Sequence, residues 1–257
     1  MNRISNYHKL EERIVKWLSD YAIQHNIKAF VIGVSGGIDS AVSSTLAAMT
    51  GLPTYVLGMP IHQNTHQESL SDAHLGWLQH NFNNVIVNKF DLTEVFESFK
   101  TTMGELGTDT LALANSRSRL RMVTLYQVSS SVGGVVVGTG NKVEDYGVGF
   151  YTKYGDGGVD IAPIADLYKT EVWELGRHLG VDQRIVNAQP TDGLWDDGRT
   201  DEDQIGTSYE MLEWVMEKGL NEDPLFLNEE QTKAVDVYEK FNTQNKHKMI
   251  SIPTFKL

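Results

Sequence analysis

The chain has 257 residues, of which 40% are hydrophobic and 22% are charged, and these values suit one sizeable α/β domain. Its formal net charge of -12 argues against nucleic acid as a partner, because sequence-independent binding to phosphates requires clustered Lys and Arg. No apolar run reaches the length of a signal peptide core or a membrane span, so we expect a cytoplasmic protein with no membrane partner.

The first elements are a helix, a buried strand and a loop. Residues 7–25 carry apolar side chains at helical spacing, and residues 29–34 form an apolar, β-branched run that is typical of a parallel strand. A Ser-Gly-Gly sequence at 35–37 then breaks the strand, and a helical pattern begins at Ile38. Such a loop lets backbone N–H groups and the helix N-terminus converge on an anion.

This loop lacks the Lys of a Walker-type phosphate loop and carries Asp39 in the first helical turn. A carboxylate there suits a bound Mg²⁺ that bridges it to phosphate oxygens. In the alternative interpretation the glycines form only a tight turn, and Asp39 is only a favourable first-turn acid.

Strand and helix patterns then alternate, which predicts right-handed crossovers and a parallel sheet. The predicted strands are 54–59, 84–90, 134–138 and 161–164, and the predicted helices include 65–81 and 108–131. We expect His74 and His80 to be solvated on the first of these helices. We interpret His62 and His66 as a loop histidine and a helix-start histidine rather than a metal pair.

A second glycine-flanked turn follows the strand at 134–138, and it should lie beside the first loop, where the strand order reverses. Thr139 in this turn is placed to hydrogen-bond a nucleotide. Glu144 is placed to be a second carboxylate for Mg²⁺, although an acid at a helix start is the commoner explanation.

Three later stretches have polar compositions that suggest binding surfaces. The aromatic and glycine-rich stretch 150–163 predicts an ordered loop around a flat, charged group, although such loops also simply turn. Arg117, Arg119 and Arg121 form either a ligand site or a solvated basic face. The polar segment 190–203 has the composition of a lid, and helices are expected near 202–218 and 229–244.

Together these motifs resemble the ammonia-dependent NAD synthetases, which belong to the N-type ATP pyrophosphatases. The resemblance spans essentially the whole chain and rests on Ser35 to Ser40, 138–142, 152–157, 167–170, 190–191 and 247–248. It implies a doubly wound, five-stranded parallel sheet with helices on both faces, an adenine nucleotide alpha hydrolase-like (Rossmann-like) fold. It also implies a single domain over 1–257 without a glutaminase domain.

The family reaction is the last step of NAD biosynthesis, in which ATP and ammonia convert deamido-NAD to NAD, AMP and pyrophosphate through an adenylated intermediate. The chain has no cysteine, so it lacks the thiol that glutamine amidotransferases generally use to release ammonia. The resemblance also implies a homodimer with the substrate site near the subunit boundary, and Mg²⁺ as the cofactor.

The resemblance assigns roles residue by residue. ATP binding falls to Gly33, Val34, Ser35, Gly36, Gly37, Ile38, Asp39, Ser40, Thr139, Lys169 and Thr191. Deamido-NAD binding falls to Arg119, Lys153, Asp160, His247 and Lys248. Mg²⁺ binding falls to Asp39 and Glu144, and catalysis to Asp39, Lys169 and Asp156, the last as receiver of the ammonium proton. The alternatives are an ATP-dependent ligase for another carboxylate, and a nucleotide sensor without turnover.

Overall fold

The computed structural model describes residues 3–63, 65–191 and 200–256. The strands are β1 (Phe30–Gly33), β2 (Thr54–Gly58), β3 (Val85–Lys89) and β4 (Val135–Val136). The α-helices are α1 (Tyr7–Gln24), α2 (Ile38–Met49), α3 (Thr65–Asn81), α4 (Thr93–Thr102), α5 (Thr110–Val132), α6 (Lys169–His178), α7 (Gln183–Val186), α8 (Asp201–Ile205), α9 (Tyr209–Glu217) and α10 (Glu229–Met249). Shorter helical turns are η1 (Gly104–Thr108), the π-helix η2 (Val143–Val148), η3 (Gly219–Asn221) and η4 (Pro224–Phe226). None of the described helices combines the length and the apolar character needed to cross a membrane.

In the described part of the chain the sheet has four parallel strands in the order β3-β2-β1-β4. β1 therefore has β2 on one side and β4 on the other, which confirms the predicted reversal of strand order beside the first loop. The predicted fifth strand at 161–164 is wrong. Ile161 makes only an isolated parallel bridge to Val137, and Pro163 cannot donate the next ladder hydrogen bond.

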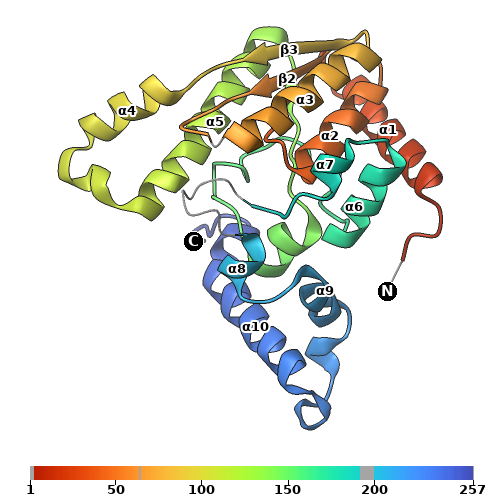
Figure 1. Cartoon of the computed structure of the whole chain (residues 1–257), viewed down its shortest axis with the longest axis vertical. Helices are drawn as coiled ribbons and strands as arrows, with labels where there is room; N and C mark the ends of the chain where they lie inside the picture. Colours follow the sequence, from red (N-terminus) through yellow and green to blue (C-terminus); the bar gives the residue numbers. More distant parts are fainter. Residues whose placement is uncertain (1–2, 64, 192–199, 257) are drawn as a thin grey trace.

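Helices cover both faces of the sheet (Figure 1). Phe30 and Ile32 of β1 pack into the main core with α1, α2, α3, α6 and α7, whereas Val31 points to the opposite face and packs with α4 and α5. This alternation follows from the two-residue period of a strand. It explains why β1 is apolar at every position, as the sequence predicted for a strand buried on both faces.

A second, smaller core lies beyond the carboxyl end of the sheet, where α8, α9 and α10 pack on η2 (Figure 1). The predicted helix 202–218 is in fact α8 and α9, because Gly206 has φ 97° and ends the first of them. α10 extends beyond the predicted end at 244 and includes His247 and Lys248.

His74 is buried, so the prediction that it is solvated is wrong. Its side chain faces α2, where Nε2 lies 3.1 Å from Ser44 Oγ, and its ring stacks on Trp77 with centroids 5.5 Å apart. His80 is exposed as predicted. His62 is also exposed, and its Nε2 lies 2.7 Å from Glu97 Oε1.

Candidate active site

The loop between β1 and α2 is held in a sharp turn by its own backbone and side chains. Gly36 has φ 90°, and a Cβ built there would lie 2.7 Å from the carbonyl oxygen of Gln67. Ser40 Oγ donates to Gly37 O at 2.9 Å and accepts from Ser35 N at 3.1 Å. Glycine is therefore required at position 36 both for conformation and for space.

The loop is also anchored from outside. Ser71 on α3 donates its hydroxyl to Val34 O at 2.7 Å. Ile38 is buried, and a Cβ added at Gly176 on α6 would lie 2.5 Å from its Cδ1. An apolar residue at 38 thus serves to dock the start of α2 onto α6, while Ser35 and Gly37 remain exposed.

Three charged side chains from separate elements meet at the end of this loop. Lys169 Nζ, at the start of α6, lies 2.7 Å from Asp39 Oδ2 and 2.8 Å from Glu144 Oε1. The side chain of Lys169 is 2% exposed, and those of the two acids are 18% and 16% exposed. The fold therefore brings together the residues that the sequence assigned to metal and phosphate binding.

One ammonium group faces two largely buried carboxylates, and the pKa values reflect this. Burial alone lowers the pKa of Lys169, but Asp39 and Glu144 outweigh it and the net pKa is raised. Burial raises the pKa of Glu144, yet the donors Lys169 and Tyr209 bring it below its usual value. The pKa of Asp39 is raised, because burial and the charge of Glu144 outweigh Lys169.

The two carboxylates, Asp39 and Glu144, are suitable ligands for a hard cation. Asp39 and Glu144 each hold a carboxylate oxygen within hydrogen-bond reach of one nitrogen, so their oxygens converge. Mg²⁺ prefers carboxylate oxygens and completes its shell with water and phosphate oxygens. The two acids could therefore hold it next to the loop, and the excess of negative charge over the single lysine favours a further cation.

Sequence reasoning missed two residues that hold these acids. Asn141 is fully buried, its Nδ2 donates to Asp39 Oδ1 at 3.1 Å, and its Oδ1 accepts from the backbone N of Glu144 at 3.2 Å. Tyr209 on α9 donates its hydroxyl to Glu144 Oε1 at 2.6 Å. Asn141 lay within a quoted motif, whereas nothing in the helical pattern around Tyr209 indicated a polar role.

The residues assigned to deamido-NAD fall into two groups. Lys153 Nζ donates to His247 O at 2.7 Å, and both Nε and Nη2 of Arg119 donate to Lys153 O at 3.3 Å. Lys248 Nζ donates to Tyr151 O at 2.8 Å, so four of the five residues gather around the loop after η2. Asp160 lies apart from them, in the segment that follows this loop and contacts β4.

Asp160 and Asp156 both use their carboxylates to organise the chain. Asp160 accepts from the backbone N of Val136 at 2.8 Å and from the hydroxyl of Tyr126 at 2.9 Å. Asp156 Oδ1 accepts from Ser118 Oγ at 2.7 Å and from the backbone N of Thr152 at 3.0 Å. These contacts give each acid a role in loop geometry beside its predicted role toward substrate.

The two predicted ATP-binding threonines are Thr139 and Thr191. Thr139 is half-buried and lies two residues before Asn141, whose Nδ2 donates to Asp39 beside the first loop. Thr191 is exposed and precedes residues 192–199, which lie outside the described residues and contain most of the predicted lid.

Arg121 has a structural role among the three clustered arginines. Its Nε donates to Met59 O at 2.9 Å and its Nη2 to Gln63 Oε1 at 3.0 Å, which ties α5 to the end of β2. Burial lowers its pKa to about 10. Arg119 points elsewhere, as the helical spacing predicted, and is exposed.

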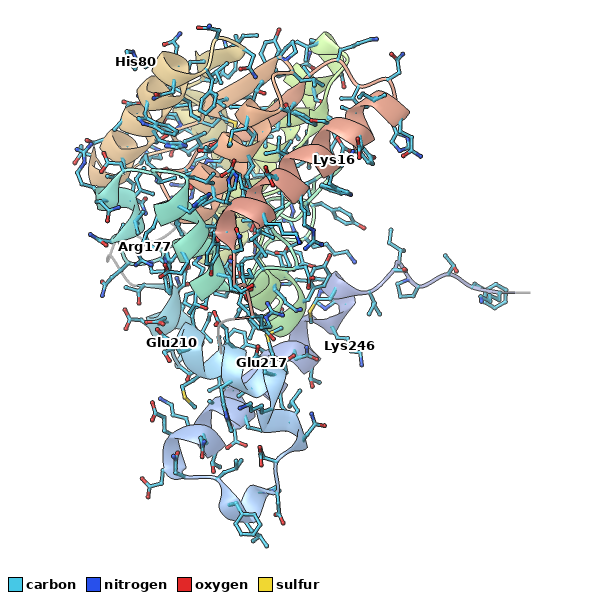
Figure 2. The ribbon with its side chains drawn as sticks, turned by 90° about the vertical axis from the view of Figure 1, so that its right-hand side faces the viewer. Lys16, His80, Arg177, Glu210, Glu217 and Lys246 are labelled. Carbon is cyan, nitrogen blue, oxygen red and sulfur yellow. The ribbon has the colours of Figure 1, made fainter. Side chains whose placement is uncertain are left out.

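A cavity of about 620 Å³ lies between α1, α6 and α9, but none of the predicted site residues lines it. Figure 2 shows Arg177 of α6 above Glu210 and Glu217 of α9, three of the residues that line the cavity. Glu213 in its wall accepts from the backbone N and hydroxyl of Thr170. The carboxylate oxygens of Glu213 are thus engaged in capping α6.

The sheet is parallel and carries a glycine loop at the carboxyl end of β1. Two acids and a lysine lie beside this loop. These features are typical of nucleotide-binding α/β proteins. The model of the NAD synthase family matches residues 10–253. The NH(3)-dependent NAD(+) synthetase of Finegoldia magna is 37% identical over 246 residues, which cover 95% of this chain and 94% of that protein. That of Alkaliphilus metalliredigens is 34% identical, covering 94% and 96%.

Solved structures are similar in the same way. An NMN synthetase from Francisella tularensis has a TM-score of 0.87 and 31% identity, and the alignment covers 99% of this chain and all of that one. An NH3-dependent NAD synthetase from Campylobacter jejuni shares the fold, with a TM-score of 0.76 and 23% identity over 98% of this chain. The chain belongs to the NAD synthase family, and it is an enzyme.

Proposed function

We propose that this enzyme makes NAD from deamido-NAD, ATP and ammonia, and that the reaction passes through an adenylated intermediate. The family match over nearly the whole chain supports the overall reaction. The observation that carries the chemical proposal is the convergence of Asp39, Glu144 and Lys169 at the end of the glycine loop. A group of that charge and position suits a triphosphate with its cation.

The proposed reaction has two steps. In the first, an oxygen of the nicotinate carboxylate attacks the α-phosphorus of ATP, and the bond to the β-phosphate oxygen breaks with release of pyrophosphate. In the second, ammonia attacks the activated acyl carbon, AMP leaves with the former carboxylate oxygen, and the nitrogen loses a proton. Adenylation is needed because a free carboxylate has no adequate leaving group.

The loop residues 33–40 would bind the phosphates through their backbone N–H groups and the N-terminus of α2. Asp39 and Glu144 would hold Mg²⁺, which neutralises charge on the departing pyrophosphate when it is bound. Lys169 contacts both acids in this structure, and its ammonium would neutralise charge on a phosphate oxygen when ATP is bound. Thr139 and Thr191 are proposed to contact ATP from the neighbouring turns.

Arg119, Lys153, His247 and Lys248 are proposed to bind the pyridine nucleotide. Their mutual contacts tie α5, the loop after η2 and the end of α10 together, which supports one shared surface. Asp160 is proposed to belong to the same surface, although its carboxylate also caps β4. Asp156 remains our candidate for receiving the ammonium proton.

A homodimer with the substrate site near the subunit boundary is also proposed. The arm formed by α4, η1 and the start of α5 projects from the sheet in Figure 1. This arm exposes large apolar side chains: Val95 is 53% accessible, Leu106 76% and Leu111 59%. Arg119 lies on α5, about two turns after Leu111. Sedimentation of the purified protein tests this, and a monomer at micromolar concentration would contradict it. A cytoplasmic location stays a prediction.

A second candidate substrate is the mononucleotide, nicotinate mononucleotide, which would be amidated by the same two steps to NMN. The likeness to the NMN synthetase of Francisella tularensis at 31% identity over 99% of this chain favours it. The two substrates share the reacting pyridine carboxylate and differ only in the second nucleotide. The proposed roles of Asp39, Glu144 and Lys169 would be the same for both substrates.

One experiment distinguishes these proposals. The purified chain is incubated with ATP, Mg²⁺, ammonium and either deamido-NAD or nicotinate mononucleotide, and kcat/KM is measured for each. NAD or NMN together with AMP and pyrophosphate supports adenylation, and the larger kcat/KM identifies the substrate. Formation of ADP and phosphate would exclude the adenylated intermediate, and an absence of product with both would contradict the proposed reactions.

The role of Asp39 is tested separately. In Asp39→Ala we expect no pyrophosphate release and an unchanged circular dichroism spectrum, because the residue is a proposed metal ligand on an otherwise intact helix. Normal turnover by this variant would refute the metal role.

A further inference from the structure

Tyr209 combines complete burial with a polar contact to the candidate metal site. Its side chain is 0% exposed in the second core, at the first residue of α9. Its hydroxyl lies 2.6 Å from Glu144 Oε1, and its ring lies 4.9 Å from Lys169 Nζ. The phenol thus touches both partners of the ion pair that meets at the glycine loop.

The phenol proton goes to Glu144. A tyrosine hydroxyl has one proton, and a second acceptor, Asp201 Oδ2, lies 3.3 Å away. An O–H···O hydrogen bond is strongest near 2.7 Å, so the 2.6 Å contact to Glu144 is the favoured one. An ionised carboxylate has no hydrogen to give, so the phenol is the donor in this pair.

Position 209 is held by the chain that precedes it. The backbone N of Tyr209 donates to Glu202 Oε1 at 2.8 Å, and Ser208 caps α9. These contacts hold the backbone at position 209, and the ring packs edge-on against Trp173 with centroids 6.0 Å apart, so the phenol is held by groups other than Glu144. Lys169 donates to the same oxygen, Oε1, so both donors constrain one side of the Glu144 carboxylate.

We propose that Tyr209 is a positioning residue, which fixes the rotation of the Glu144 carboxylate and thereby strengthens cation binding beside the loop. This inference rests on the proposed metal role of Glu144 and adds a residue that touches neither nucleotide nor cation. Partners of metal-binding side chains change metal affinity by 10- to 100-fold when they are removed.

The test measures cation binding without turnover. Mn²⁺, as a probe for Mg²⁺, is titrated into the full-length protein saturated with a non-cleavable ATP analogue, and free Mn²⁺ is counted by electron paramagnetic resonance. A blank with analogue alone is subtracted. Wild type is compared with Tyr209→Phe, Glu144→Gln and the double variant, and melting temperatures are recorded for each.

Tyr238→Phe is the matched control. Tyr238 is 8% exposed in the same core, and its hydroxyl makes no hydrogen bond to Glu144 in the described part of the chain, so its variant reports the cost of losing a tyrosine hydroxyl from this core. We expect Tyr209→Phe to raise the Kd for Mn²⁺ at least tenfold, and Tyr238→Phe to change it less than twofold. In the Glu144→Gln background, Tyr209→Phe should add less than twofold, because the carboxylate it orients is gone.

Two results would overturn the inference, and they differ from each other. If Glu144→Gln weakens Mn²⁺ binding but Tyr209→Phe does not, the metal role stands and the tyrosine is only a core residue. If Glu144→Gln binds Mn²⁺ like wild type, the proposed metal role fails and the inference fails with it. A lower melting temperature with unchanged Mn²⁺ affinity counts as the first of these results.

Discussion

Lys169 Nζ lies 2.7 Å from Asp39 Oδ2, although 130 positions separate the two residues in the chain. Replacing Lys169 with Met leaves Asp39 and Glu144 facing each other without a cation. Breaking such a largely buried pair costs roughly 3 kcal/mol or more. We expect urea unfolding at pH 7.5 to show this loss, and activity to disappear.

The control is Lys142→Met, since Lys142 pairs at 2.7 Å with Asp166, whose side chain is 93% exposed. An exposed pair contributes about 0–1 kcal/mol. Equal stabilities for the two variants would show that Lys169 is not needed to neutralise the two acids.

Alanine substitutions at Gly36 and Gly51 separate two effects of an added Cβ, which are steric overlap with neighbouring atoms and strain at a positive φ. Both have positive φ, at 90° and 78°, but a Cβ at Gly36 would lie 2.7 Å from Gln67 O, and one at Gly51 would meet nothing within 4 Å. We expect Gly51→Ala to cost about 1–2 kcal/mol through backbone strain alone. Gly36→Ala should cost more and should also weaken ATP binding at least tenfold, measured by calorimetry. Equal ATP affinity in both variants would contradict a phosphate-binding role for the loop.

His74 should make stability depend on pH. Burial lowers its pKa from 6.5 to about 4 in the folded protein, so between these values the unfolded chain binds the extra proton. Stability is therefore complete above pH 6.5 and declines as the pH falls toward 4. At pH 5 the loss amounts to about 2 kcal/mol from this residue.

The substitution His74→Gln removes the titrating group and keeps a partner for Ser44. The free energies of unfolding of wild type and variant are measured by urea titration from pH 8 to pH 5. Between these pH values the difference between the two proteins should change by about 2 kcal/mol, because only the wild type loses stability through residue 74. Parallel pH profiles would show that His74 does not titrate as its burial requires.

Ser118 should set the geometry of the loop that carries Lys153. Its hydroxyl donates to Asp156 Oδ1 at 2.7 Å and accepts from the backbone N of Asp156 at 2.9 Å. Ser118→Ala leaves a backbone donor without its partner, which costs about 1–3 kcal/mol. We expect the KM for the pyridine nucleotide to rise several-fold with a smaller change in kcat. Ser116→Ala on the same helix loses only a bond to Ala112 O, so an equal effect there would rule out the loop explanation.

Local patterns predicted the first strand, the loop after it and the helix that follows. The apolar period of β1, the glycine break at 36 and the helical spacing after Ile38 are properties of neighbouring residues, and the structure confirms them. Errors arose where a distant contact decided the outcome. The stretch 161–164 has strand composition but finds only one bridge partner, and His74 looks polar but faces α2.

The sequence by itself determined the class of fold, the family and which acids and lysines are candidates for the site, because motif spacing is written along the chain. Only the tertiary structure decided that Asp39, Glu144 and Lys169 meet, that Asn141 and Tyr209 hold the acids, and that Asp160 caps β4. The physical reason is that parallel crossovers carry the carboxyl ends of separate strands to one edge, and hydrogen bonds there join residues too distant for any local pattern to relate.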